Sequence, residues 1–210
     1  MGDEERTWAP PIEAITGSAG HLEGRRLTGP QQGFGQLWQK TYRVFVPDHE
    51  PKAVIATWKA NYGDFWPSVN KFNAPVAGIK PGEVGSIDSM QVLSTGVVVI
   101  YADDTSFAFM TPEGHPFAGW ITFSAIPEGG GSVAQVQLLI RASEPLWDLG
   151  FVFGAGKGED WMWRHTLKAL ATHLGSDAKP TQEIVKVDRK RLWQNSGNWK
   201  RNAIFRRSRR

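Results

Sequence analysis

The chain of 210 residues is long enough for one domain with a full hydrophobic core and short for two. Apolar residues make up 40% and charged residues 21%, which excludes a disordered protein, and no apolar run reaches the roughly 20 residues of a membrane-spanning helix. The net charge is +3, and the lack of cysteine excludes disulfides and thiolate chemistry.

The first part of the chain predicts an extended segment, a strand and a helix. Residues 1–36 are rich in Gly and Pro and predict an N-terminal arm. Their acidic start has no apolar run and is not a secretory signal, so we expect a cytoplasmic protein. Apolar and polar residues alternate over 38–46, which predicts a strand. Pro51 then begins a helix that we expect to continue to about Trp66.

The middle of the chain predicts an antiparallel meander. Residues 72–82 are interrupted by Pro and Gly and are expected to be irregular. Five strands then follow at short intervals with no helix between them, as in a meander. We expect them at residues 84–92, 97–101, 106–110, 119–126 and 132–142.

A last helix is predicted over residues 159–174. Trp163, Leu167, Leu170 and Leu174 form one apolar stripe along it. The glycine-rich segment 154–158 before it lacks the residues of a nucleotide-binding loop. We expect that segment to be a flexible entry into the helix.

The basic character of the chain lies in its tail. Residues 186–210 hold ten Lys or Arg and one acid, so they carry +9 and residues 1–185 carry −6. A short strand is predicted at 183–187. Basic residues alternate with Leu and Trp, which suits a membrane, RNA or an acidic partner, and the alternative is a solubilising extension. The candidate contacts to an anionic partner are Arg189, Lys190, Arg191, Lys200, Arg201, Arg206 and Arg207.

The order strand, helix, meander and long helix predicts an α+β helix-grip fold. In this fold a bent antiparallel sheet wraps a long C-terminal helix. We expect the domain at residues 37–176, between an N-terminal arm (1–36) and a basic C-terminal tail (177–210). Because a strongly curved sheet does not close fully on one helix, a cavity between them is expected.

One stretch carries a family resemblance. The acidic turn Asp103-Asp104 and a strand precede the pattern Thr-x-x-Gly-His-Pro-x-x-Gly-x-x-x-Phe, which is formed by Thr111, Gly114, His115, Pro116, Gly119 and Phe123. With Ser143-Glu144-Pro145 and the final helix, residues 38–175 resemble an uncharacterised family of small proteins. That family is related to the START-like, polyketide-cyclase and lipid-transfer (SRPBCC) superfamily. The resemblance implies a START-like fold. Where the family tends to carry acids this chain has Phe117, Trp120 and Ile121, so the implied site is more apolar.

The main functional hypothesis is binding of an apolar small molecule or lipid in the expected cavity. Aromatic side chains of both helices and of the strands are the candidate ligand-binding residues, unless they fill the core themselves. They are Trp58, Tyr62, Phe65, Tyr101, Phe109, Trp120 and Trp163. A second hypothesis is a scaffold that acts through its tail.

His115 is the candidate catalytic residue. It could donate a hydrogen bond to a ligand carbonyl, or transfer a proton in a cyclase- or hydratase-like reaction. The structural alternative is a loop histidine that bonds to nearby backbone. No pair of His or Glu has metal-ligand spacing, so we expect no metal, and no cofactor is expected.

Overall fold

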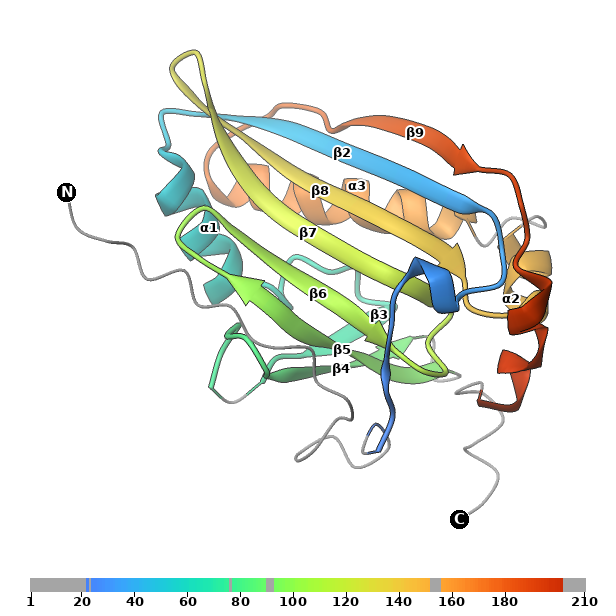
Figure 1. Cartoon of the computed structure of the whole chain (residues 1–210). Coiled ribbons are helices and arrows are strands. Elements are labelled where there is room, and N and C mark those ends of the chain that lie inside the picture. The colour runs from blue at the N-terminus through green and yellow to red at the C-terminus, as the bar shows by residue number, and fades with distance from the viewer. Residues whose placement is uncertain (1–21, 23, 76, 90–92, 152–155, 202–210) are drawn as a thin grey trace.

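The computed structural model describes residues 22, 24–75, 77–89, 93–151 and 156–201. Within these residues nine strands form one antiparallel sheet in the order β3-β4-β5-β6-β7-β8-β2-β9, with β1 paired to β6 (Figure 1). The strands are β1 (Leu27–Thr28), β2 (Leu37–Pro47), β3 (Asn70–Asn73), β4 (Val84–Ser89), β5 (Leu93–Ala102), β6 (Ser106–Pro112), β7 (Phe117–Glu128), β8 (Gly131–Ala142) and β9 (Thr181–Asp188). The helices are α1 (Pro51–Ala60), α2 (Pro145–Gly150) and α3 (Gly156–His173), with the 3-10 helices η1 (Pro30–Gln32) and η3 (Trp193–Arg201).

The predicted meander is confirmed. Strands β4 to β7 each pair with the next strand along the chain, and β8 then pairs with β2. The expected strand at 84–92 is described to Ser89, and its last residues lie outside the described part. Strand β3 was missed, and its last two residues lie in the segment expected to be irregular; four residues are too few to show an alternating pattern.

Helix α1 is shorter than the sequence predicts. It ends at Ala60 because Asn61 closes its last turn, where the backbone N–H and the side-chain Nδ2 both donate to the Thr57 carbonyl oxygen at 3.1 and 2.9 Å. Tyr62 and Phe65 therefore lie in the turn that follows α1, and both are still buried.

Helices α1 and α3 cover one face of the sheet. α1 contacts β7 and β8, and α3 contacts β2 and β8 (Figure 1). The expected helix over 159–174 overlaps α3, which buries the stripe of Trp163, Leu167 and Leu170 against the sheet. Within the described residues no helix has the length and apolar character needed to cross a membrane.

The sheet extends into both segments that the sequence assigned to an arm and a tail. Strand β1 pairs with β6 through Leu27 and Thr28, on the arm side of residue 36. Strand β9 contains the predicted strand 183–187 and pairs with β2 along seven residue pairs. The expected boundaries at residues 36 and 176 lie between elements, and the strands β1 and β9 outside them add to the sheet; the division into arm, domain and tail stays a prediction.

Candidate functional site

The loop between β6 and β7 is built by the residues of the family pattern. Thr111 Oγ1 accepts a hydrogen bond from Gly119 N at 3.1 Å and donates to Gly119 O at 3.2 Å, so it joins the two strands across the loop. Gly114 turns the chain with a φ of 87°, which favours glycine. The pattern therefore fixes the backbone, and it presents His115 at the end of the sheet.

His115 is buried and neutral. Its Nδ1 lies 3.0 Å from Phe117 N and 3.2 Å from Phe117 O. When Nδ1 accepts from the closer Phe117 N–H, the ring proton of the neutral imidazole lies on Nε2. Burial lowers the pKa of His115 from 6.5 to about 4, although the nearby Phe117 carbonyl oxygen, which favours a protonated Nδ1, raises it in part. The backbone bond expected as the structural alternative is present, and the Nε2 edge remains for a ligand.

A cavity of about 130 Å³ lies between the sheet and α3, and we call it the inner cavity. Its walls are mostly apolar and come from the turn after α1, from β5 to β7, and from α3. They include four sequence-predicted site residues, which are Tyr62, Phe109, His115 and Trp163. Further lining residues are Trp66, Ile121 and Met162.

The other predicted ligand-binding residues lie elsewhere. Trp58 and Phe65 are buried in the core and line none of the three cavities described here. The Tyr101 hydroxyl donates to Asp103 at the end of β5. Trp120 points to the opposite face of β7 from Ile121, because neighbouring residues of a strand face opposite sides of the sheet.

Aromatic side chains fill most of the space between the sheet and the helices. The Tyr62 ring packs edge-on against Phe107, Phe109 and Phe123 at centroid distances of 5.8, 5.3 and 5.3 Å. Phe107 and Phe123 stack at 4.7 Å. The interior is thus largely a core, and the inner cavity is what these rings leave open.

The sequence did not reveal Glu159 as a site residue. This carboxylate at the start of α3 is 9% exposed and lines the inner cavity, and among the described residues its Oε1 has only a loose contact with the side chain of Trp163, which lowers the pKa of Glu159. Its Oε2 accepts from Lys40 Nζ at 2.7 Å. Burial raises the pKa of Glu159 in spite of the charge of Lys40, which lowers it.

The sequence contains one indication of this cluster, a lysine at a core-facing position of a strand. Lys40 occupies an inward position of β2, in phase with the buried residues Tyr42 and Val44. A buried cation on a core-facing position requires an anion. Two anions are present, because Lys40 also bonds to Asp160 at 2.7 Å and Tyr42 Oη donates to Asp160 at 2.6 Å. These carboxylates outweigh the effect of burial, which lowers the pKa of Lys40, and its pKa is raised.

A second cavity of about 280 Å³ adjoins the first at the start of α3, and we call it the end cavity. Both cavities are lined by Phe117 and Glu159. Phe117 stacks on Phe151 at a centroid distance of 4.5 Å, and Trp38 and Ile140 add further apolar wall. The carboxylate of Glu159 therefore lies where the two spaces meet.

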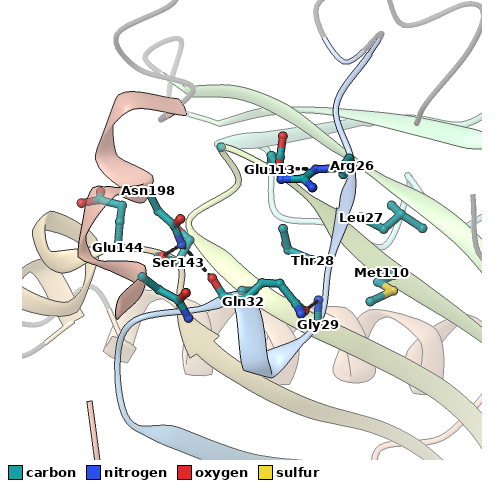
Figure 2. A pocket seen from close by; sticks show the side chains of 13 residues that line it. Arg26, Leu27, Thr28, Gly29, Gln32, Met110, Glu113, Ser143, Glu144 and Asn198 are labelled. Atoms are coloured by element: carbon teal, nitrogen blue, oxygen red, sulfur yellow. Dashed lines mark hydrogen bonds and ion pairs between the residues drawn. The ribbon is translucent and has the colours of Figure 1, made fainter. Parts of the chain in front are cut away.

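A third cavity, of about 370 Å³, is lined by the segment around β1 and η1, by η3 and by sheet residues (Figure 2). Its polar side chains are largely bonded within the protein. Arg26 Nη2 pairs with Glu113 Oε1 at 2.9 Å, and Asn198 Nδ2 donates to the carbonyl oxygens of Gln32 and Ser143 at 2.7 and 2.8 Å. We therefore treat the inner cavity, with the poorly bonded Oε1 of Glu159 in its wall, as the candidate site. Among the described residues no three His, Asp or Glu side chains gather to hold a metal ion.

No protein-family model matches the chain, and no curated protein matches it. Solved structures are similar. The KanY protein (ms6282) gives a TM-score of 0.52 at 16% identity, over 68% of this chain and 99% of KanY. The di-domain ARO/CYC StfQ from the steffimycin biosynthetic pathway gives 0.51 at 9% identity, over 67% of this chain and 51% of StfQ. A START superfamily protein from Mycobacterium smegmatis gives a TM-score of 0.47 at 18% identity, over 67% of this chain and 98% of that protein.

The chain shares its fold with KanY and with the ARO/CYC protein StfQ over about two thirds of its length. The family resemblance carried by the loop around His115 is thereby confirmed at the level of the fold. Within this fold the inner cavity lies between the sheet and α3, where the element order predicted a cavity.

Proposed function

We propose that this protein binds an apolar small molecule that carries a hydroxyl or carbonyl group, in the space between the sheet and α3. The observation that carries the proposal is an apolar cavity whose wall holds two buried polar atoms that lack a well-formed hydrogen bond, Oε1 of Glu159 and Nε1 of Trp163. Buried polar atoms that are poorly hydrogen-bonded cost free energy, and a ligand hydroxyl that bonds to Glu159 would reduce that cost. His115 Nε2–H would donate to a second ligand oxygen.

The size of the ligand follows from both cavities together. Pockets for drug-sized molecules have volumes of roughly 300–1,000 Å³. The inner cavity, at about 130 Å³, is too small for such a molecule alone, and the end cavity provides about 280 Å³ more. We therefore infer a ligand that occupies both, with its polar group beside Glu159 and its apolar body against Phe117. The fold shared with StfQ, an ARO/CYC protein of a biosynthetic pathway, supports a small-molecule ligand.

Native mass spectrometry and tryptophan fluorescence test the proposal. The probes are 2-naphthol, which has one hydroxyl on an apolar body, and dodecanoic acid, which has a flexible chain. We expect a one-to-one complex with 2-naphthol and quenching of tryptophan emission. Neither a bound species nor quenching with either probe would remove the proposal.

A substitution that fills the inner cavity localises the binding. Ile121→Phe adds volume at its wall, and Ile126→Phe makes the same change on the same strand at a residue that is 48% exposed. We expect Ile121→Phe to lose most 2-naphthol binding and Ile126→Phe to keep it. Thermal melts of both variants show whether folding is retained. Equal binding by the two variants would contradict this location.

Proton transfer by His115 is a second candidate function. It is favoured by the neutral ring, whose Nε2 has no protein hydrogen bond among the described residues while Nδ1 is held by Phe117. His115→Asn keeps an acceptor for the Phe117 N–H and removes Nε2. On any substrate found to be converted, this variant should lose turnover and keep ligand binding, and unchanged turnover would exclude the role.

A further inference from the structure

Helix η3 presents two tryptophans on one face. A 3-10 helix has three residues per turn, so side chains at i, i+3 and i+6 lie above one another. Trp193 and Trp199 stand in this relation, and they are 70% and 52% exposed. With a rise of about 2 Å per residue, the two positions are roughly 12 Å apart along the helix.

A different face of η3 fixes the helix to the body of the protein. Asn195 Nδ2 donates to two carbonyl oxygens of residues 31–33, both at 2.8 Å. One turn later, Asn198 Nδ2 donates to the carbonyl oxygens of Gln32 and Ser143. Because both asparagines are bound to the body, η3 has one orientation, and the tryptophan positions are left exposed.

Helix α2 adds aliphatic side chains beside η3. Leu146 and Leu149 are 50% and 53% exposed, and α2, a helix of six residues, buries none of its side chains fully. The two helices contact each other at one end of the sheet (Figure 1). Arg191 Nε and Asp148 Oδ2 form an ion pair at 2.7 Å between these two segments.

The exposed apolar side chains lie among basic residues. We call this set the apolar–basic surface, and it consists of Leu146, Leu149, Trp193 and Trp199 with Arg189, Lys190, Arg191 and Lys200. Residues 186–201 hold six basic residues and one acid, Asp188. That acid is bound to Arg141 at 2.6 Å. Arg191 is paired with Asp148, so Arg189, Lys190 and Lys200 supply the positive charge of this surface.

We propose that the apolar–basic surface docks the protein onto an anionic lipid membrane. Tryptophan and leucine side chains on a basic surface enter the boundary between headgroups and acyl chains, and Lys and Arg bind the anionic headgroups. The leucines decide between lipid and RNA. Bases stack on aromatic rings, but an exposed aliphatic side chain contributes nothing to stacking.

Docking in this way brings the end cavity close to the membrane. Asp148 and Arg191 join α2 to the segment before η3, and both also line the end cavity. An apolar ligand could then pass between membrane and cavity without crossing water. This last step rests on the proposed function, whereas membrane docking does not.

Sedimentation of the full chain with vesicles tests the inference. One set contains phosphatidylcholine alone and the other contains phosphatidylcholine with phosphatidylserine. We expect binding to the anionic vesicles that weakens as salt rises, with a blue shift of tryptophan emission. Binding that is equal for both vesicle sets, or absent from both, would overturn the inference, as would a preference for single-stranded RNA over anionic vesicles.

Matched variants locate the surface. Lys200→Glu changes the charge by two units and should weaken anionic-vesicle binding about five-fold per unit. The double change Leu149→Ala and Trp199→Ala should weaken it several-fold. The controls are Lys179→Glu and Trp161→Ala, which alter exposed residues outside this surface and should bind like the unchanged protein. If variants and controls bind the anionic vesicles equally well, the apolar–basic surface is not the membrane-binding surface. Retention of 2-naphthol by the Leu149 and Trp199 variant separates this result from the proposed function.

Discussion

His115 shows how one residue can combine a structural bond with an available chemical group. Its Nδ1 holds the Phe117 N–H, and that bond orients the ring toward the inner cavity. The surrounding apolar side chains keep the ring neutral, since they disfavour its charged form. The two readings of this histidine that the sequence left open, loop anchor and ligand contact, are therefore compatible in the same side chain.

The lowered pKa of His115 predicts a pH-dependent stability. Between pH 6.5 and about 4 the unfolded chain binds a proton at this residue that the folded chain does not, so stability falls as the pH falls. From pH 7.5 to 5 the free energy of unfolding should decrease by about 2 kcal/mol more in the unchanged protein than in His115→Asn. Urea denaturation at both pH values measures this difference.

A control is available in His165, which is exposed on α3. His165→Asn should keep the pH profile of the unchanged protein. If His115→Asn loses stability with acid as steeply as the unchanged protein, the histidine is not held neutral by burial.

Gly119 predicts a backbone requirement in the same pattern. Its φ of 152° is rarely adopted by residues with a side chain, and a Cβ there would overlap the Leu139 carbonyl oxygen. Gly119→Ala should therefore lower the free energy of unfolding by about 3 kcal/mol or more. Gly129→Ala is the control, because a Cβ at Gly129 meets nothing within 4 Å. Similar thermal melts for the two variants would contradict the argument.

The sequence predicted some site residues and missed others for a definable reason. A local pattern located His115, and helical spacing placed Trp163 on the buried face of α3. Trp120 was assigned to the cavity because it is aromatic. Its side chain faces the opposite side of the sheet from its neighbour Ile121, which lines the cavity. Glu159 could not be found locally, because its partner Lys40 lies 119 residues away and only the folded sheet joins them.

At the scale of elements, the start of α3 is fixed to β2 by buried charges. Lys40 bonds to both Glu159 and Asp160, and Tyr42 bonds to Asp160. Carboxylates at a helix N-terminus are favoured by the helix dipole, which adds to the ion pairs. The same contacts hold Glu159 at the junction of the inner and end cavities, so one cluster serves both anchoring and site geometry.

Lys40→Met should destabilise this junction. Removal of the cation leaves the buried Glu159 carboxylate without its partner, which costs about 3–5 kcal/mol for a buried pair. The double variant Lys40→Met with Glu159→Gln should recover part of this loss, since it removes the unpaired charge as well. Urea denaturation at neutral pH measures both. A double variant no more stable than Lys40→Met would show that the charge of Glu159 is not the cause.

The elements themselves were predicted in proportion to their apolar signal. The meander β4 to β8 and helix α3 carry long alternating or helical patterns, and the sequence located them. β9 was found only as a short strand, and η3 was missed, because their side chains are mostly exposed. Their places are set by backbone pairing with β2 and by asparagine bonds to residues 31–33, which no periodicity reports.

At the scale of the whole molecule, the aromatic content decides what the fold can hold. A sheet that curves around α1 and α3 would enclose a larger space if its lining were aliphatic. Here Tyr62, Trp66, Phe72 and Phe109 pack on one another with centroid distances of 4.7–6.0 Å and reduce the inner cavity to about 130 Å³. The aromatic side chains of the core thus set an upper limit on the size of a ligand.

Trp66→Ala should raise that limit. Trp66 lines the inner cavity and is 8% exposed, so its loss enlarges the cavity and should lower the free energy of unfolding by about 3–5 kcal/mol. Trp58→Ala removes an equally large buried ring that lines no cavity and should cost a similar amount. Native mass spectrometry with hydroxylated aromatics of two, three and four fused rings then compares the size limits. Trp66→Ala should accept a larger ring system than the unchanged protein does, whereas Trp58→Ala should not. If both variants keep the original limit, the aromatic filling does not control access.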